Sequence, residues 1–237
     1  MLKIFLPVII NRLRSWDYVT AQQVDYFIAI SEAIKNRIKK FYNKDAIAIY
    51  PPVETKKYSI SNSQDNYYLI VSRLNAYKRL DIPIEACNKL GFELKIAGDG
   101  PYRKNLEQIS KQNIEFLGRV SSEELINLYS KCRGLIFPGE EDFGITPVEA
   151  QASGRPVIAY GKGGALETVV ENETGVFFYE PTADSLVDAI KRFENITFDP
   201  QKCIENAKRF DESIFKEKML NFINDKWEEH RSLTDIP

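Results

Sequence analysis

The chain has 237 residues, enough for one large domain or for one domain and part of another. Its 32 Lys and Arg residues nearly balance its 34 Asp and Glu residues, so the overall charge gives no argument for a nucleic-acid partner. Cys87, Cys132 and Cys203 form no CxxC pair and no zinc-ligand spacing, which favours a reducing, cytoplasmic compartment.

The first residues, MLKIFLPVIINRLRSW, are apolar over a run that is too short to span a bilayer. Two interpretations stay open: a segment packed against the rest of the protein, or an interfacial segment flanked by Lys3, Arg12 and Arg14. We favour the packed segment. The basic stretch at residues 35–40 predicts a solvated helix face, with peripheral contact to the inner face of a membrane as the alternative.

Short apolar runs alternate with amphipathic helical stretches along the chain. The predicted strands are residues 25–30, 46–50, 67–72, 93–97, 114–117, 134–137, 157–160 and 175–178. Ser31, Ser121 and Thr182 stand at expected helix N-caps between them. This alternation predicts an α/β fold, with a Rossmann-like, doubly wound parallel sheet and helices on both faces. Ligands of such sheets bind outside the carboxyl ends of the strands.

Both ends of the predicted sheet region differ from its centre. Residues 200–210 and 213–230 predict helices without strands, so extra terminal helices are expected after the sheet. The apolar residues of the last helix would pack on residues 1–42 or leave a face for a partner. Before the sheet, Tyr50-Pro51-Pro52-Val53 is a stiff extended stretch that marks a boundary.

Residues 137–159, FPGEEDFGITPVEAQASGRPVIA, contain a helix start directly after a predicted strand. Thr146 has the position of an N-cap, Pro147 that of the first helical residue and Glu149 that of the third. Gly154 is expected to end the helix about two turns later. The stretch therefore predicts a helix N-terminus at the ligand-binding edge of the sheet.

Phosphate is the ligand that such a helix start favours. The amides of Gly144 and Ile145 lie just before it, and the helix dipole adds positive potential. Carboxylates would repel a diphosphate, so Glu141 and Glu149 are expected to accept hydrogen bonds from neutral hydroxyls on either side of it. A nucleotide sugar fits this pattern. For Glu149, a capping-box residue that bonds only its own helix is an equally good interpretation.

Three further loops follow predicted strands, at residues 71–79, 97–101 and 161–167. Arg73 and Lys78 would supply positive charge to a phosphate, and Gly98 and Gly100 would permit a tight turn beside a ligand. A solvated basic run or a plain turn explains each loop taken alone. Four such loops at one edge of a sheet are a stronger signal. The sequence has no Asp-x-Asp pair, so no metal site is expected.

The stretch EDFGITPVE at 141–149 resembles the E-x7-E motif of retaining glycosyltransferases of the GT-B fold, family 4 (glycosyl transferases group 1). The likeness extends over VSRLNAYKR, IAGDGP, FLGRVSSEEL and TGVFF and covers roughly residues 50–194. Within it, residues 137–170 are most similar to WbaZ-type mannosyltransferases. The likeness implies that residues 46–198 form the nucleotide-sugar donor-binding domain, the C-terminal half of a GT-B fold. Residues 1–45 would be a remnant of the N-terminal acceptor domain, and residues 199–237 the C-terminal helices.

The resemblance also implies roles for individual residues. The implied catalytic residues are Glu141, Arg73 and Lys78. The implied donor-binding residues are Gly98, Gly100, Arg119, Val120, Phe143, Gly144, Ile145 and Glu149. Arg73 and Lys78 would bind the diphosphate, and Glu141 the hydroxyls of the sugar. Glu149 would bind the ribose, and Arg119 with Val120 the base.

The activity implied is transfer of a hexose with retention, expected to be mannose from GDP-mannose, to a glycan or lipid-linked acceptor. Neither a metal nor a cofactor is expected. The isolated chain is expected to be inactive without the N-terminal domain, which a separate chain could supply. Two alternatives stay open: a non-catalytic nucleotide-sugar-binding module or subunit, and another GT-B enzyme such as an epimerase or a phosphorylase.

Overall fold

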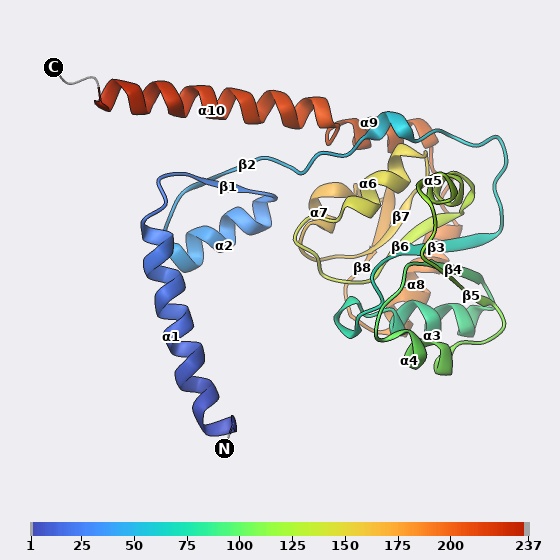
Figure 1. The fold of residues 1–237 in the computed structure, drawn as a ribbon. Coiled ribbons are helices and arrows are strands. Elements are labelled where there is room, and N and C mark those ends of the chain that lie inside the picture. The colour runs from blue at the N-terminus through green and yellow to red at the C-terminus, as the bar shows by residue number, and fades with distance from the viewer. Residues whose placement is uncertain (1, 235–237) are drawn as a thin grey trace. The chain divides into compact units, whose positions relative to one another are not determined.

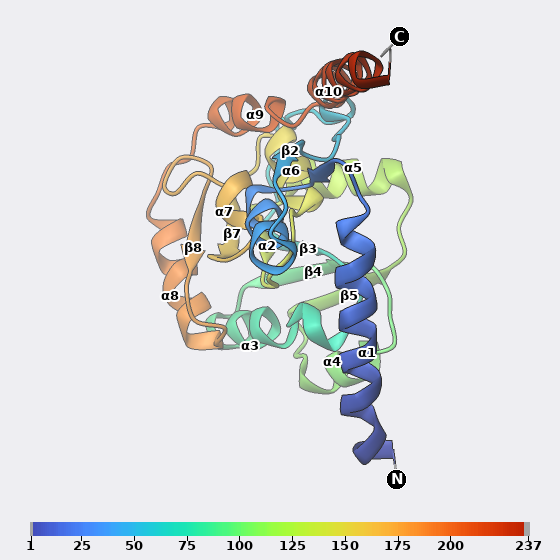
Figure 2. The same ribbon diagram turned by 90° about the vertical axis from the view of Figure 1, so that its left-hand side faces the viewer.

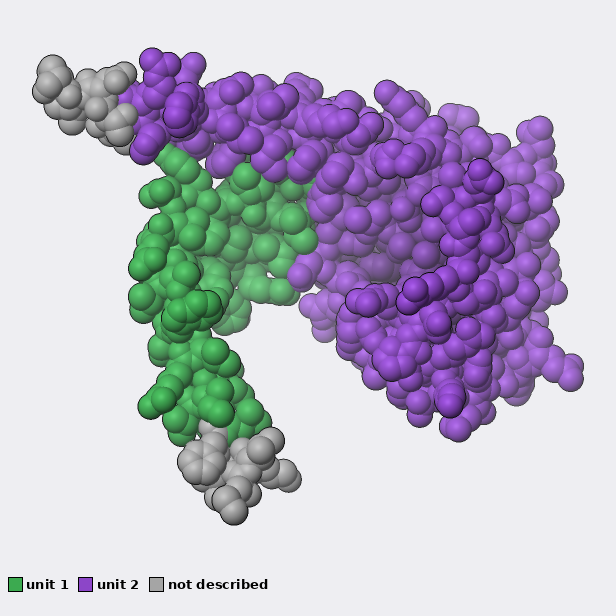
Figure 3. Space-filling view, viewed as in Figure 1, with its two compact units in different colours: residues 1–50 green, residues 51–237 purple. Residues whose placement is uncertain are grey.

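The computed structural model describes residues 2–234, and the contacts divide the chain into two units, residues 1–50 and 51–237 (Figure 3). The division falls between Tyr50 and Pro51, at the stiff stretch that the sequence marked as a boundary. Strand β2 (Ala46–Ala48) therefore belongs to the first unit, whereas we expected residues 46–198 to form one domain. The assignment of acceptor and donor domains stays a prediction.

The second unit contains a parallel sheet with the strand order β5-β4-β3-β6-β7-β8 (Figure 1). Its strands are β3 (Tyr67–Val71), β4 (Glu93–Ala97), β5 (Ile114–Gly118), β6 (Gly134–Phe137), β7 (Val157–Tyr160) and β8 (Gly175–Phe178). Every predicted strand of this region is present, and the expected Rossmann-like, doubly wound sheet is confirmed. The chain winds outward from β3 to β5 and then returns to β6, so its direction reverses between β3 and β6.

Helices cover both faces of this sheet (Figures 1 and 2). One apolar cluster contains residues of α3 (Asp81–Leu90), α4 (Arg103–Ile109) and α8 (Ala183–Glu194). The other contains residues of α5 (Ser122–Lys131), α6 (Ile145–Ala152) and α7 (Ala165–Thr168). Along β3, Tyr68 and Ile70 join the first cluster while Tyr67 and Leu69 join the second. Parallel strands that are buried on both faces have continuous apolar sequences, which is why these strands could be predicted from the sequence.

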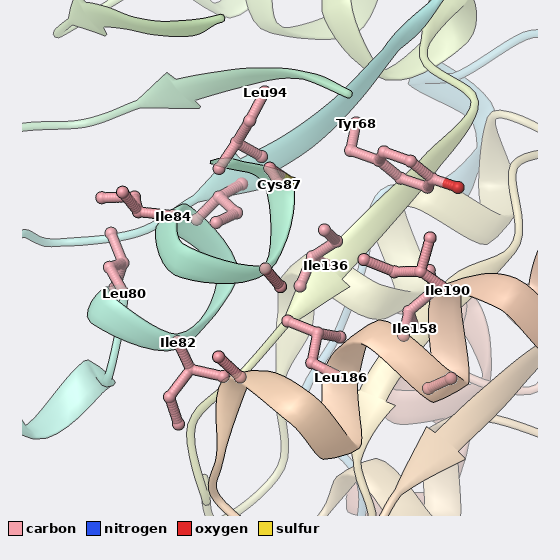
Figure 4. Packing of buried hydrophobic residues seen from close by; sticks show 14 of the residues in the cluster. Tyr68, Leu80, Ile82, Ile84, Cys87, Leu94, Ile136, Ile158, Leu186 and Ile190 are labelled. Carbon is pink, nitrogen blue, oxygen red and sulfur yellow. The ribbon is translucent and has the colours of Figure 1, made fainter. Parts of the chain in front are cut away.

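The close packing of the first cluster is visible in Figure 4. Ile136 of β6 and Ile158 of β7 lie beside Leu186 and Ile190 of α8, and all four are at most 1% exposed. Helix α8 starts where Thr182 was expected to cap it, because the Thr182 side chain accepts a hydrogen bond from the amide of Ser185. The cluster therefore fixes the sheet and, through it, the loops at the strand ends.

The first unit consists of α1 (Leu2–Gln22), β1 (Phe27–Ala29), α2 (Glu32–Tyr42) and β2. Strands β1 and β2 pair in parallel, and the Ser31 side chain caps α2 as expected by accepting from the amide of Ile34. The apolar N-terminal segment is a helix whose described side chains, apart from Ala21, are exposed. The most exposed of its apolar side chains are Leu6, Val8, Ile9, Leu13, Trp16 and Val19. The expected packing of this segment is not formed within the first unit, and it stays a prediction.

The expected C-terminal helices are present as α9 (Pro200–Lys208) and α10 (Glu212–Thr234). Helix α9 packs on α6, and a short 3-10 turn, η1 (Thr55–Lys57), also contacts α6. Helix α10 leaves Leu220, Ile223 and Trp227 exposed. Of the helices that the structure describes, none is long and apolar enough to cross a bilayer.

Candidate functional site

An ion pair joins the loops that follow β3 and β6. Lys78 ends the 3-10 turn η2 (Ala76–Lys78) after β3, and its Nζ donates to Oε1 of Glu141, which follows β6. The two side chains are only 19% and 24% exposed. They lie at the carboxyl ends of neighbouring strands at the point where the winding direction reverses, which is where open α/β sheets bind ligands. The structure therefore brings two of the predicted site residues together.

The loop after β7 packs directly against the backbone of Glu141. The amide of Gly164 donates to the Glu141 carbonyl at 2.8 Å. A Cβ on Gly163 would lie 2.4 Å from the same oxygen, and a Cβ on Gly164 would lie 2.2 Å from the Cα and the carbonyl oxygen of Phe143. Phe143 itself is buried against Phe210. This glycine loop therefore shapes the acidic loop by close backbone contact.

Gly98 and Gly100, in the loop after β4, have a comparable role toward the loop that carries Arg73. A Cβ on Gly98 would lie 1.9 Å from the carbonyl oxygen of Ser72, and one on Gly100 would lie 2.5 Å from that of Leu74. Gly98 also has φ 134°, which disfavours any other residue. Both glycines are thus required for contact between two loops at the carboxyl edge, and their contact with a donor stays a prediction.

Arg73, Arg119 and Val120 lie at the same edge of the sheet as the ion pair. Arg73 is exposed just after β3, and Arg119 is exposed just after the edge strand β5. Val120 packs against the second apolar cluster. Among the described side chains, no hydrogen bond or ion pair connects either arginine to Lys78 or Glu141. No group of three His, Cys, Asp or Glu side chains among the described residues is arranged to hold a metal ion.

Helix α6 begins two residues earlier than predicted. Gly144 is its N-cap, with φ 92°, and Ile145 is its first residue, so Pro147 occupies the third position. The expected start, with Thr146 as the N-cap and Pro147 as the first residue, is wrong. A proline is tolerated at the third position because the first amides of a helix have no partner within it. The positive φ and the close approach of the Phe137 ring require glycine at 144.

Glu149 is held by tyrosines from outside its own helix. Its Oε2 accepts from the hydroxyl of Tyr129 at 2.6 Å, and Tyr58 lies near the same carboxylate. Burial, and next the charge of Glu149, raise the pKa of both tyrosines. With Glu149 as the fifth residue of α6, the capping-box interpretation is wrong. Sequence reasoning missed both tyrosines; the one available signal was that a buried tyrosine such as Tyr129 needs an acceptor.

Several known proteins are similar to this chain. Residues 53–210 match the family described as Glycosyl transferases group 1. An uncharacterized glycosyltransferase of Methanocaldococcus jannaschii is 31% identical over 210 residues, which cover 86% of this chain and 60% of that protein. The O-antigen chain mannosyltransferase C of Escherichia coli is 25% identical over 234 residues, which cover 91% of this chain and 61% of that protein.

Among solved structures, Anabaena HepE in complex with UDP and glucose has the same fold, with a TM-score of 0.72 and 22% identity. The similarity covers 85% of this chain and 63% of that one. The chain therefore spans about three fifths of the length of the proteins that it resembles.

Proposed function

Because the chain belongs to the glycosyl transferases group 1 family, we propose that it is the donor-binding part of a retaining glycosyltransferase that transfers a hexose from a nucleotide sugar. The observation that carries this proposal is the contact of Lys78 with Glu141 at the point where the sheet reverses its winding. The contact puts a cation suited to a diphosphate beside a carboxylate suited to sugar hydroxyls.

In the proposed reaction, Lys78 and Arg73 stabilise the departing nucleoside diphosphate, which is electrostatic catalysis of the leaving group. The first amides of α6 add positive potential at the same edge. A bound diphosphate draws the ammonium of Lys78 away from Glu141, and the freed carboxylate then accepts hydrogen bonds from the sugar. Transfer proceeds with retention through an oxocarbenium-like state, without a metal or a cofactor.

For the donor, we propose mannose carried by GDP. The similarity to an O-antigen mannosyltransferase supports mannose. UDP-glucose is the second candidate, because the HepE structure holds UDP and glucose. In either case Glu149, oriented by Tyr129, binds the ribose hydroxyls, and Arg119 and Val120 contact the base.

The acceptor is proposed to be a glycan or a lipid-linked glycan, bound by a part that this chain does not contain. The support is that the chain spans three fifths of its relatives and that its first unit leaves apolar groups of β1 and β2 exposed. A separate chain would supply that part. A cytoplasmic location is proposed, supported by three buried, unpaired cysteines. A nucleotide-sugar-binding module that completes another chain, or another GT-B enzyme such as an epimerase, would use the same donor site.

The test is calorimetric titration of the intact chain with GDP, UDP, ADP, GDP-mannose and UDP-glucose, repeated with Glu141→Gln. We expect GDP-mannose to bind more tightly than GDP. In Glu141→Gln, which keeps the volume and removes the charge, GDP-mannose affinity should fall about tenfold or more while GDP affinity stays within about twofold. Absence of binding to every nucleotide, or equal losses for GDP and GDP-mannose, would overturn the assignment of Glu141 to the sugar.

A further inference from the structure

A cavity of about 470 Å³ lies at the amino ends of the strands, the edge opposite to Lys78 and Glu141. Asn66, Arg133 and Pro156, which line it, directly precede β3, β6 and β7. The end of α8 and the segment that follows it form the remaining wall. Because parallel strands all point the same way, this cavity is separate from the proposed donor site.

The cavity contains a buried cation, Arg155, whose residue is only 7% exposed. Its Nε donates to the carbonyl of Ser130 at 2.8 Å, and Nη2 donates to the carbonyls of Ser130 and Ser63. Within the described part of the chain, no carboxylate pairs with it and Nη1 makes no hydrogen bond. No fully buried side-chain nitrogen or oxygen there lacks a partner, so Nη1 keeps some exposed surface, and Arg155 is a residue that lines the cavity.

Two of the other charged groups that line this cavity, Arg133 and Glu194, pair with each other. Arg133 donates to the carboxylate of Glu194 and to the side-chain oxygen of Asn66, and Tyr68 also donates to Glu194. Arg155 thus keeps a positive charge that only neutral carbonyls compensate. A buried charge without a counter-ion is costly, so an anion at Nη1 would be favourable. Glu194 and the exposed Asp65 in the lining oppose an anion with several charges.

Part of the cavity lining is apolar. The rings of Phe193 and Phe198 pack at 4.9 Å between centroids, and Pro156 and Ile196 extend the same surface. A ligand that matches both parts has one negative group and an aromatic or aliphatic body. Most of the exposed lining is polar, so the apolar part would contact only one side of such a ligand.

We propose that this cavity binds a small organic monoanion, with its carboxylate on Nη1 of Arg155 and its apolar body against Phe198. The ligand is a different molecule from the nucleotide sugar and binds at the opposite edge of the sheet. Gly154 and Arg155 follow α6 and its C-cap Ser153, and the first residues of α6 belong to the proposed donor site, so the two edges are connected by one short helix.

The experiment is an NMR titration of the isotope-labelled intact chain with 3-phenylpropionate, following backbone amide shifts. We expect saturable shifts at residues that line the cavity, and affinity at least about tenfold lower for the uncharged amide of the same acid. Arg155→Gln should weaken binding by a similar factor. Thr197→Trp, at an exposed lining position, should block the cavity while leaving Arg155 intact. Lys191→Gln, on the exposed face of α8, is the control and should bind as the wild type does.

Three results would overturn the proposal: no saturable shifts in the wild type, equal affinity for the acid and its amide, or unchanged binding in Thr197→Trp. Because Arg155 bonds to two carbonyls, Arg155→Gln is first compared with the wild type by thermal unfolding. Should it fail to fold, Thr197→Trp and the amide decide the question. Titration with GDP in the same samples shows that the donor site is unaffected, so failure of this proposal is distinguishable from failure of the proposed function.

Discussion

Lys78 carries the ammonium group on which the proposed diphosphate site depends. Lys78→Met removes a charged hydrogen bond worth about 1.5–3 kcal/mol, so GDP affinity should fall roughly tenfold to a hundredfold. Calorimetry at low and high salt measures this, and the wild type should lose affinity with salt more steeply than the variant. Lys89→Met is the control, since Lys89 pairs with Asp184 at an exposed site. Equal GDP affinity in the wild type and Lys78→Met would contradict the role of Lys78.

Tyr129 orients Glu149 through a single hydrogen bond of 2.6 Å. Tyr129→Phe should lower the free energy of unfolding by about 1 kcal/mol and weaken GDP binding about threefold to tenfold, because the carboxylate loses a fixed position. Tyr67→Phe is a matched control: its hydroxyl donates to the Leu128 carbonyl at 2.9 Å, away from Glu149. Denaturant unfolding and calorimetry measure both effects. A similar loss of GDP affinity in the two variants would mean that Tyr129 acts only through stability.

The loop between β7 and α7 sets the position of the acidic loop, so its glycines should affect both stability and binding. In Gly164→Ala, the new Cβ meets the backbone of Phe143 at 2.2 Å, and relief requires a backbone shift that costs about 1–3 kcal/mol. The shift moves Glu141, so affinity for GDP-mannose should fall. Gly91→Ala is the comparison, because its Cβ would meet nothing within 4 Å and only its φ of 73° is strained. Loss of stability in Gly164→Ala with unchanged GDP-mannose affinity would argue against this coupling.

The start of α10 is tied to residues 53–55 by Asp211, whose carboxylate accepts from Ser213 and Thr55. These hydrogen bonds, from Ser213 and then Thr55, lower the pKa of Asp211 to about 2. The unfolded pKa is about 3.8, so the stabilisation is fully present above about pH 4 and is lost as the pH falls through 2.

Asp211→Asn should therefore lower the free energy of unfolding by about 2 kcal/mol at pH 7 and by little near pH 2. Urea unfolding across this pH range measures the difference. Asp184→Asn, at an exposed position on α8, serves as the control and should leave stability nearly unchanged across this pH range. A penalty for Asp211→Asn that stays constant from pH 7 to pH 2 would show that the charge of Asp211 is not its cause.

The two units differ in how completely they bury their sheets. The second unit covers both faces of its sheet, whereas in the first unit Ile28 of β1 and Ile47 of β2 remain exposed. A parallel sheet of two strands rarely stands alone, because parallel strands are normally covered on both faces. This supports the proposal that a further polypeptide completes the first unit.

Adding that polypeptide should restore sugar transfer. We expect the intact chain alone to show no transfer of radiolabelled mannose from GDP-mannose. The missing part can be taken from the Methanocaldococcus jannaschii relative, as the region of that protein that this chain does not span. A mixture of the two should form a complex and transfer the mannose. Sedimentation measures the complex. Glu141→Gln in the mixture should abolish transfer and leave the complex intact. Transfer by the chain alone, at a rate normal for such enzymes, would contradict the proposal.

Local patterns were enough to predict some features and not others. Buried runs such as 134–137 and 157–160 were predicted as strands with the bounds that β6 and β7 have, because their burial on both faces leaves a continuous apolar signal. The start of α6 was mispredicted, because Gly144 is required by the ring of Phe137, a contact no local pattern records. The exposure of α1 within the first unit was not predicted either, since apolar composition does not say what covers a segment.

The sequence by itself determined the fold class, the strands and most helix caps of this protein, because periodicity and capping depend on residues within a few positions of one another. Only the tertiary structure decided which charges meet. Lys78 and Glu141 are 63 residues apart, and they pair because the sheet order sets β6 beside β3. The tertiary structure likewise decided that Tyr129 donates to Glu149 and that Arg155 is buried with no partner for Nη1 among the described residues. Hydrogen-bond partners and burial depend on packing between segments that are distant in the sequence.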